Sequence, residues 1–526
     1  MYSYSHDYEI AEILLNGEDL TGYVLTGEGD ALPYLELLQE TLLERSGIFL
    51  PIESEPLVKA ISFAVTAGLD GAKTTLTADD AGLTISANGK NAMYFGLCAF
   101  LDFIEASTQD GRATMTVDNT VTLSNAAYAA PSAGAFYNAD GELDRNGDGK
   151  IHIVFIGGSL TQSNQVWCPP VVEYFKSQFP NKTVTYTNAG IGATDSTMGA
   201  IRFARDVLSG EEPDLVFIEY AVNDAGFIRE SDYTLKKNGV YIESMIRQCL
   251  AHENRPAVAL LYFPRGFEPD SEAWKNWEGG VALKERIAEN YGIKSVNVLE
   301  YVKALYETQK AANPALTYGD FLLQYYNASD MVHPTAVGYG VFRDAILAAL
   351  EADFEGFLTN RQDADFCLAD YRREILTKWE LIPLDEYNVT VTGNVIRYEE
   401  TPSYKSDDPR YIPDGSFDYP RFTDGILQVE DGSSFTISFD ARANVIGIYG
   451  LHSPAGMTVD IYNDDTGAKL GSISIKENHT RPLLVTLTQD AARRLNTYKI
   501  VPSGSNTAAD TVFRMGYIVL GTYPAE

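Results

Sequence analysis

The pattern of apolar and polar positions is most regular between residues 138 and 360. Short apolar runs alternate there with longer segments in which apolar residues recur every three or four positions. The apolar runs are IHIVFI (151–156), TVTYTNAG (183–190), DLVFIEYA (214–221), AVALLYF (257–263) and KSVNVLEYV (294–302). Near-continuous apolar strands separated by amphipathic helices are typical of a parallel sheet covered by helices on both faces. We therefore predict an α/β domain in the middle of the chain.

The chain has a different pattern on either side of this domain. Residues 1–125 mix short strands with amphipathic helical segments. From residue 385 to 526, short alternating strands are separated by polar and Gly-rich turns, which is typical of a β-sandwich. We predict three domains: a small α+β domain over 1–125, an α/β domain over 138–380 and a jelly-roll-like β-sandwich over 385–526. Residues 126–137 have the composition of a linker.

The charge of the chain restricts its partners. The 73 acidic residues outnumber the 40 basic residues, which gives a net charge of −33. Such a chain repels phosphate backbones and acidic membrane surfaces, so we expect neither a nucleic acid nor a membrane as partner. Neutral substrates such as sugars or simple esters remain compatible with this charge.

The cysteines and the amino terminus indicate the cellular compartment in which the protein is expected. Cys98, Cys168, Cys249 and Cys367 are far apart in the sequence and form no CxxC pair, which suits a reducing compartment. The first twenty residues lack a basic region followed by an apolar core, so no signal peptide is visible. We expect a cytoplasmic protein, or a secreted one whose signal has been removed.

Four polar features follow predicted strands or precede the final helix of the α/β domain. They are Ser159, NAGIGAT (188–194), AVND (221–224) and DMVHPT (330–335). Ligands of open parallel sheets bind outside the carboxyl ends of the strands. A serine hydrolase needs a nucleophile, a base, a group that orients the base, and donors for the oxyanion. These features offer a candidate for each role.

The resemblance to a known family rests on these features. Over residues 150–350 the chain resembles the SGNH (GDSL-type) esterases, with GGSLT as the first block, Gly158 standing where many members have Asp, and Asp330 and His333 as the Asp-x-x-His pair. This resemblance implies a three-layer α/β/α fold. It also implies that Ser159 is the nucleophile, that His333 is the base and that Asp330 holds the imidazole tautomer.

The oxyanion donors come from the same resemblance. AVND matches the third block, which implies that the side-chain amide of Asn223 donates to the oxyanion, together with the backbone N–H of Ser159. The second block contributes a further backbone N–H, and NAGIGATDS aligns either Gly192 or Ala193 with that position. We predict Gly192.

A second motif precedes the first strand. DRNGDGKIHIVF puts Asp144, Asn146, Asp148 and Gly149 where a calcium-binding EF-hand loop has its first ligands and its sharp turn. Its twelfth position, which requires a bidentate Glu, is Phe155. We therefore interpret the segment as a polar turn, and a weak cation site stays open. No metal and no organic cofactor is expected.

Aromatic residues near the site in sequence are candidates for sugar stacking. Trp274, Trp277 and Tyr326 are predicted to bind substrate, with half-buried helix anchors as the alternative. Residues 403–422 contain five further aromatic side chains that could serve a carbohydrate-binding sandwich.

These features together lead to one functional hypothesis and two alternatives. We expect a serine esterase that removes O-acetyl groups from an oligosaccharide or polysaccharide. The alternatives are a lipase or aryl esterase of the same fold, and a non-catalytic carbohydrate-binding protein. The N-terminal domain resembles the accessory domain that precedes the catalytic domain in several glycoside hydrolase families. Whether the chain forms a homo-oligomer stays open.

Overall fold

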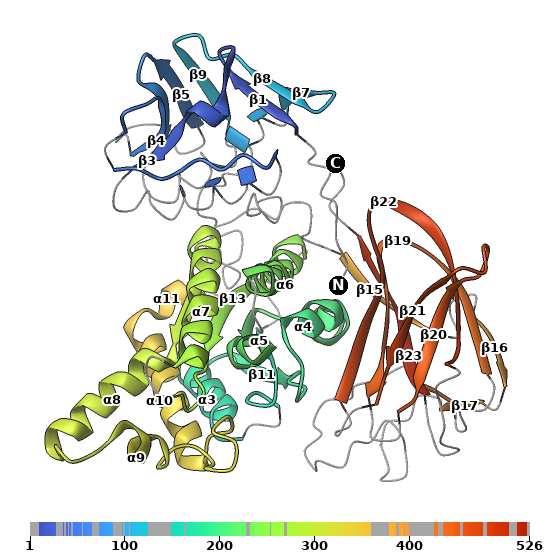
Figure 1. Cartoon of the computed structure of the whole chain (residues 1–526). Helices are drawn as coiled ribbons and strands as arrows, with labels where there is room; N and C mark the ends of the chain where they lie inside the picture. Colours follow the sequence, from blue (N-terminus) through green and yellow to red (C-terminus); the bar gives the residue numbers. More distant parts are fainter. Residues whose placement is uncertain are drawn as a thin grey trace. The chain divides into compact units, whose positions relative to one another are not determined.

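The structure, a computed structural model, is shown in Figure 1. It describes the chain except for residues 1–9, 28–34, 36–37, 40–41, 44–45, 55, 66–72, 88–96, 98–99, 102, 105, 125–148, 163–164, 228–231, 253, 268–270, 359–377, 385–388, 394, 399–425, 430–434, 453–455, 477–480, 504–512 and 523–526. The chain divides into two compact units, each described by itself below. Unit 1 comprises Met1–Ser132, Glu289–Gly292 and Arg361–Arg373, and unit 2 comprises Ala133–Ala288, Ile293–Asn360 and Glu374–Glu526.

Unit 1 contains two sheets among its described residues. The first has the strand order β2-β1-β8-β7, and the second has the order β3-β4-β6-β5-β9. The strands are β1 (Glu12–Leu15), β2 (Glu18–Asp19), β3 (Val24–Thr26), β4 (Ala60–Val65), β5 (Lys73–Asp79), β6 (Gly82–Ala87), β7 (Thr108–Gln109), β8 (Arg112–Met115) and β9 (Thr120–Ser124). Both sheets mix parallel with antiparallel pairs.

The predicted parallel sheet forms the centre of the α/β domain in unit 2. Five parallel strands lie in the order β11-β10-β12-β13-β14. They are β10 (Lys150–Gly157), β11 (Thr183–Asn188), β12 (Leu215–Glu219), β13 (Ala257–Tyr262) and β14 (Lys294–Asn297). Every residue of β12 and β13 is buried, as expected for strands with helices on both faces. The predicted α/β architecture is confirmed.

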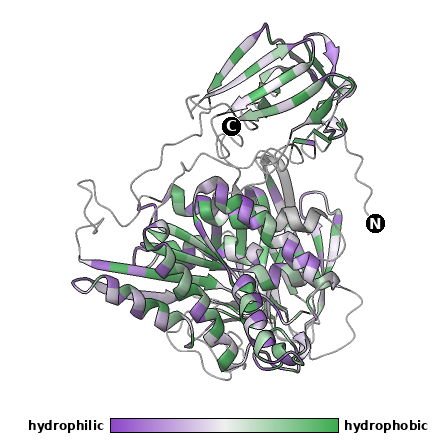
Figure 2. Ribbon diagram, turned by 90° about the vertical axis from the view of Figure 1, so that its left-hand side faces the viewer, coloured by the Kyte–Doolittle hydropathy of each residue, from purple (hydrophilic) through white to green (hydrophobic). Residues whose placement is uncertain are grey.

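Helices cover both faces of this sheet. They are α3 (Cys168–Gln178), α4 (Ser196–Phe203), α5 (Ala221–Phe227), α6 (Asp232–Ala251), α7 (Glu272–Tyr291), α8 (Val298–Ala312), α9 (Tyr318–Leu322), α10 (Ala336–Ala352) and α11 (Phe354–Phe357). Helices α3, α8 and α10 contribute to one buried core with the strands, and α4 and α6 contact each other and the sheet. Figure 2 shows that these helices are amphipathic, since hydrophobic and hydrophilic residues alternate along them.

One predicted strand is shorter than the sequence suggested. The apolar run at 294–302 was expected to be extended throughout, but β14 ends at Asn297 and α8 begins at Val298. The side chain of Asn297 accepts a hydrogen bond from the N–H of Leu299 at 3.1 Å. This N-cap satisfies a backbone donor of the first helical turn and so converts the second half of the apolar run into helix.

The carboxyl-terminal part of unit 2 is an antiparallel, β-sandwich-like sheet of nine strands. Its main order is β17-β18-β23-β19-β22-β20-β21, with β15 paired to β23 and β16 paired to β19. The strands are β15 (Lys378–Pro383), β16 (Val389–Gly393), β17 (Val395–Tyr398), β18 (Ile426–Val429), β19 (Phe435–His452), β20 (Thr458–Asn463), β21 (Lys469–Ser474), β22 (Arg481–Pro502) and β23 (Phe513–Thr522). Register shifts near Val445 interrupt the long β19–β22 pair. Below we call this sheet the sandwich.

The sandwich packs on α4 through a shared hydrophobic cluster. Met198 and Ile201 of α4 are buried there against side chains of the sandwich, which are Trp379, Val445, Tyr449, Leu451, Tyr517 and Val519. The indole N–H of Trp379 also donates to Ser244 Oγ at 3.3 Å. The α/β domain and the sandwich therefore share a core within unit 2.

Several sequence features lie outside the described residues. These are the linker at 126–137, three residues of the calcium-like loop (Asp144, Asn146 and Asp148) and the aromatic stretch at 403–422. Within the part of the chain that the structure describes, no helix is both long enough and apolar enough to cross a membrane.

Candidate active site

Ser159 lies in a tight turn directly after β10. The strand ends at Gly157, and the backbone N–H groups of Thr161 and Gln162 both donate to Gly158 O, at 3.2 and 3.0 Å. The turn brings Ser159 to the carboxyl edge of the central strand, where ligands of such sheets bind.

The two glycines before Ser159 are required by close packing. A Cβ at Gly157 would overlap the Thr161 side chain and would lie 2.6 Å from the backbone oxygen of Glu219. A Cβ at Gly158 would lie 2.6 Å from the side-chain nitrogen of Asn223. The absence of side chains therefore lets the turn approach both β12 and the amide of Asn223.

His333 connects Ser159 to Asp330. Its Nε2 lies 2.9 Å from Ser159 Oγ, and its Nδ1 lies 2.8 Å from Asp330 Oδ2. Although partial burial acts in the opposite direction, hydrogen bonds from His333 and from the N–H of Val332 keep the pKa of Asp330 below its ordinary value. An ionised carboxylate only accepts, so Nδ1 carries the proton of the neutral ring and Nε2 is left as the acceptor that faces Ser159.

A constrained loop holds the Asp-x-x-His pair. The N–H of Asn327 donates to His333 O at 3.0 Å, and the N–H of Met331 donates back to Asn327 O at 2.9 Å. Met331 has a φ of 53°, in the left-handed region that a non-glycine residue rarely adopts. The neighbouring loop after β13 fixes this conformation, because the N–H of Gly266 donates to Met331 O at 2.8 Å. Such strained loops persist where the surrounding contacts determine them.

The predicted oxyanion donors approach the same serine. The Asn223 amide donates one N–H to Thr194 O at 2.5 Å, which leaves its second N–H for another acceptor. Gly192 lies close to Ser159, since a Cβ built on it would be 3.6 Å from Ser159 Cβ. Its N–H donates to Gln162 Oε1 at 2.5 Å. Ala193, the alternative donor, has a φ of 58°.

Gln162 therefore occupies the acceptor position of the Gly192 N–H. The side-chain oxygen of Gln162 is an amide carbonyl, chemically similar to the carbonyl oxygen of an ester. A substrate oxygen can bind this N–H only after the Gln162 side chain has moved. No sequence pattern singled out Gln162, because its role depends on a contact with a loop thirty positions away.

The buried carboxyl group of Glu219 accepts hydrogen bonds from the turn that carries Ser159. Glu219, the last residue of β12, accepts a hydrogen bond from Thr161 Oγ1 at 3.1 Å and another from the N–H of Gly158. Burial raises the pKa of Glu219 to about 8, against the opposing effect of the hydrogen bond from Thr161. Sequence reasoning missed this residue, although one acidic residue at the end of an otherwise apolar strand was a usable signal.

The predicted sugar-stacking residues do not offer their faces to a ligand. Trp277 and Tyr326 are only 2% and 3% exposed, and Trp274 is 7% exposed. The indole N–H of Trp277 donates to Phe263 O at 3.0 Å, and the hydroxyl of Tyr326 donates to Pro264 O at 2.7 Å. These three side chains are core anchors, which corrects the prediction that they bind substrate.

The remaining geometry suits nucleophilic chemistry at a carbonyl carbon. The structure brings together a hydroxyl, an imidazole acceptor, an orienting carboxylate and a side-chain amide from three separate segments of the chain. Among the described residues, no group of three or more His, Cys, Asp or Glu side chains is arranged to hold a metal ion.

Comparisons with known proteins agree with this fold. Residues 155–341 match the model of the GDSL-like Lipase/Acylhydrolase family. No curated protein sequence matches the chain.

Two solved structures of a two-domain esterase (CEX) active on acetylated mannans match the chain with a TM-score of 0.53. Their identities are 18% and 19%, and each match covers 76% of this chain and 98% of the other. The acetylxylan esterase Axe2 from Geobacillus stearothermophilus matches at 20% identity with a TM-score of 0.30, over 38% of this chain and 93% of the other. Residues 155–341 thus form a GDSL-like lipase/acylhydrolase domain, and the chain shares its fold with the two-domain esterase.

Proposed function

We propose that the chain is a serine esterase that removes O-acetyl groups from a carbohydrate through an acyl-enzyme intermediate. The observation that carries this proposal is the continuous hydrogen-bonded series from Asp330 through His333 to Ser159. A nucleophile hydrogen-bonded to a base, with the base oriented by a third group, is the arrangement that activates a serine hydroxyl.

In the first half of the reaction, Ser159 Oγ attacks the acetyl carbonyl carbon while His333 Nε2 takes the hydroxyl proton. The resulting tetrahedral intermediate collapses when His333 returns this proton to the sugar oxygen, and the carbon–oxygen bond to the sugar breaks. In the second half, His333 takes a proton from water, and the hydroxide attacks the acetyl-serine. Acetate leaves, and the proton returns to Ser159 Oγ.

The oxyanion receives its hydrogen bonds from groups around the turn. We assign this role to the free N–H of Asn223 Nδ2 and to the backbone N–H groups of Ser159 and Gly192. Donors held in place before the reaction stabilise developing charge without a reorganisation cost. The Gln162 side chain vacates the Gly192 donor when the substrate carbonyl binds.

The choice of an acetylated carbohydrate has two supports. The side chains of Asp330 and His333 are each 41% exposed, so the reacting groups face solvent and are accessible to a large polar substrate. The two-domain esterase with the same fold is described as active on acetylated mannans. Acetylated glycans of this kind are neutral, which also agrees with the net charge of −33.

We expect Ser159→Ala to lower kcat for p-nitrophenyl acetate by about 10³-fold or more, because the nucleophile is removed. Circular dichroism and the thermal midpoint should match the wild type. A folded Ser159→Ala protein with unchanged kcat would contradict the assigned nucleophile.

We expect Gly158→Ala to lower kcat and kcat/KM for p-nitrophenyl acetate together, by about 10²-fold, because the new methyl group displaces the Asn223 amide. The displaced group is a side chain, so the thermal midpoint should change little. Gly157→Ala is the matched comparison: its methyl group meets the backbone of Glu219, and we expect loss of stability there. Equal kinetics for Gly158→Ala and wild type would show that Asn223 is not a donor.

Substrate choice is tested by acetate release from acetylated mannan and xylan oligosaccharides, compared with p-nitrophenyl butyrate and octanoate. We expect kcat/KM to be highest for an acetylated oligosaccharide. A preference for the longer acyl esters would instead favour the lipase or aryl esterase alternative.

A further inference from the structure

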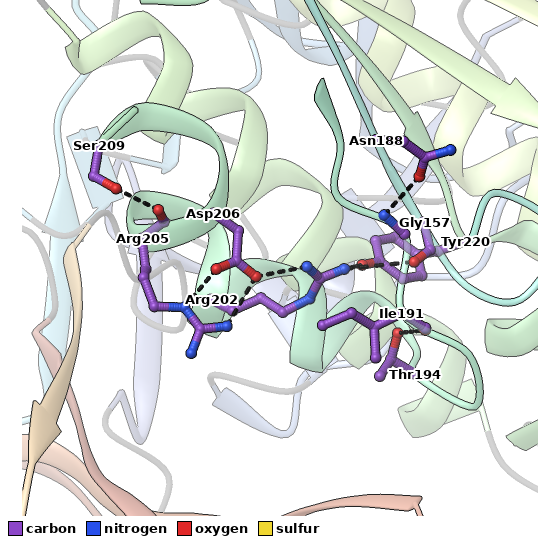
Figure 3. A network of polar contacts seen from close by, with 10 residues as sticks. Gly157, Asn188, Ile191, Thr194, Arg202, Arg205, Asp206, Ser209 and Tyr220 are labelled. Atoms are coloured by element: carbon purple, nitrogen blue, oxygen red, sulfur yellow. Dashed lines mark hydrogen bonds and ion pairs between the residues drawn. The ribbon is translucent and has the colours of Figure 1, made fainter. Parts of the chain in front are cut away.

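A group of charged residues, Arg202, Arg205 and Asp206, lies largely buried next to the loop that carries Ile191 and Thr194 (Figure 3). Arg202 of α4 donates through Nη1 to Asp206 Oδ2 at 2.7 Å, and Arg205 donates to both oxygens of the same carboxylate. Neither the Arg202 side chain nor the Asp206 side chain is exposed to solvent. Two guanidinium groups thus share one carboxylate in the protein interior.

Arg202 also contacts two groups of the active-site framework. Its Nη2 donates to the hydroxyl of Tyr220 at 2.9 Å and to the backbone oxygen of Gly157 at 3.4 Å. Gly157 immediately precedes the turn of Ser159, and Tyr220 immediately follows β12. One buried side chain therefore connects α4 to the ends of both central strands.

The contacts continue from Tyr220 to the loop that carries Gly192, one of the proposed oxyanion donors. Burial raises the pKa of Tyr220 to about 12, so its hydroxyl keeps its proton near neutral pH. That hydroxyl is hydrogen-bonded to Thr194, whose own hydroxyl proton is donated to Ile191 O at 2.6 Å. Tyr220 thus accepts from Arg202 and also contacts the Thr194 side chain.

The series ends at the proposed oxyanion donors. Thr194 O is the acceptor of the Asn223 amide, at 2.5 Å. An amide group can be reversed by rotation about its last bond, and this hydrogen bond fixes the nitrogen rather than the oxygen toward Thr194. Ile191 and Thr194 flank Gly192, which carries the second proposed donor.

At the other end of this series of contacts, Arg205 packs against the sandwich. The guanidinium group of Arg205 lies 5.3 Å from the ring centroid of Tyr517 of β23, within the range of a cation–π interaction. Tyr449 of β19 stacks on Tyr517, with the ring centroids 5.7 Å apart. Arg205 and Asp206 lie in a short π-helical segment, Ala204–Leu208, that extends α4. Such segments are rare and frequently occur at functional sites.

We propose that Arg202 is a positioning residue for ester hydrolysis and that the sandwich holds it in place through Tyr517, Arg205 and Asp206. The role rests on the proposed esterase function. Arg202 does not touch the substrate; it fixes Tyr220, and through Tyr220 and Thr194 it sets the orientation of the Asn223 amide. The sandwich is thus part of the framework of the active site.

The test is a double-mutant cycle with p-nitrophenyl acetate, using Arg202→Met in the wild-type and Asn223→Ala backgrounds of the full chain. Methionine keeps much of the buried volume and removes the hydrogen bonds. In the wild-type background we expect kcat and kcat/KM to fall together by about 10- to 100-fold, because the donor is misplaced. In the Asn223→Ala background we expect less than about a 3-fold further loss, since residues that act through one another are not additive.

Two variants at the sandwich separate positioning from stability. Tyr517→Leu removes the ring below Arg205 and should lower kcat by about 3- to 10-fold, again only when Asn223 is present. Val519→Ala removes packing from the same cluster without touching the charged residues, and should lower the thermal midpoint while kcat stays unchanged. If Arg202→Met does not fold, the Tyr517→Leu cycle decides.

Wild-type kcat in a folded Arg202→Met or Tyr517→Leu protein, or equal losses in both backgrounds, would overturn the proposal. An inactive wild type would count against the proposed esterase function instead. Crystal structures of the wild type and Arg202→Met then decide about Arg202 itself: we expect the hydrogen bond between Asn223 and Thr194 to be lost in the variant, and its retention with unchanged positions for residues 190–194 contradicts the positioning role.

Discussion

The close approach of the turn after β10 to β12 and to Asn223 is the constraint on which the site depends. There is no space for a Cβ at Gly157 or Gly158. The turn therefore sits against the backbone of Glu219 and below the Asn223 amide, and Ser159 is held within hydrogen-bonding distance of His333. A larger side chain at either glycine would separate the nucleophile from the groups that must stabilise its reaction. The close packing at Gly157 and Gly158 therefore determines the geometry of the site.

This packing places polar groups in the interior, and the fold supplies hydrogen-bond partners for Glu219 and Arg202. Glu219 receives the N–H of Gly158 and the hydroxyl of Thr161. Burying ionised side chains costs several kcal/mol for each group unless partners compensate, so a fully buried group such as Arg202 needs all of its contacts. The sandwich places the Tyr517 ring against Arg205, which shares the Asp206 carboxylate with Arg202. It is therefore joined to the α/β domain by a shared core and by the electrostatics of its Tyr517 and Arg205 contact.

The sequence was informative wherever a pattern is local. Apolar runs predicted β10, β12 and β13, because a strand buried on both faces must be apolar throughout, and the Asp-x-x-His spacing identified Asp330 and His333. It failed at β14, where the local cap of Asn297 on α8 was overlooked. It also failed where the outcome depends on distant contacts: Trp277 and Tyr326 are buried and donate to backbone oxygens in the loop after β13. Gln162 was missed because its partner Gly192 lies 30 positions away, and Arg202 because its contact with Gly157 spans 45 positions.

The central claim is that Ser159 is an activated nucleophile within one hydrogen-bonded site. The most direct measurement is intact-protein mass spectrometry after reaction with a serine-directed fluorophosphonate, followed by peptide mapping of the adduct. We predict a single adduct, located on Ser159, that forms in the wild type and is greatly slowed in His333→Ala. No adduct on the folded wild type, an adduct on a different residue, or equal labelling rates in both proteins would contradict the claim.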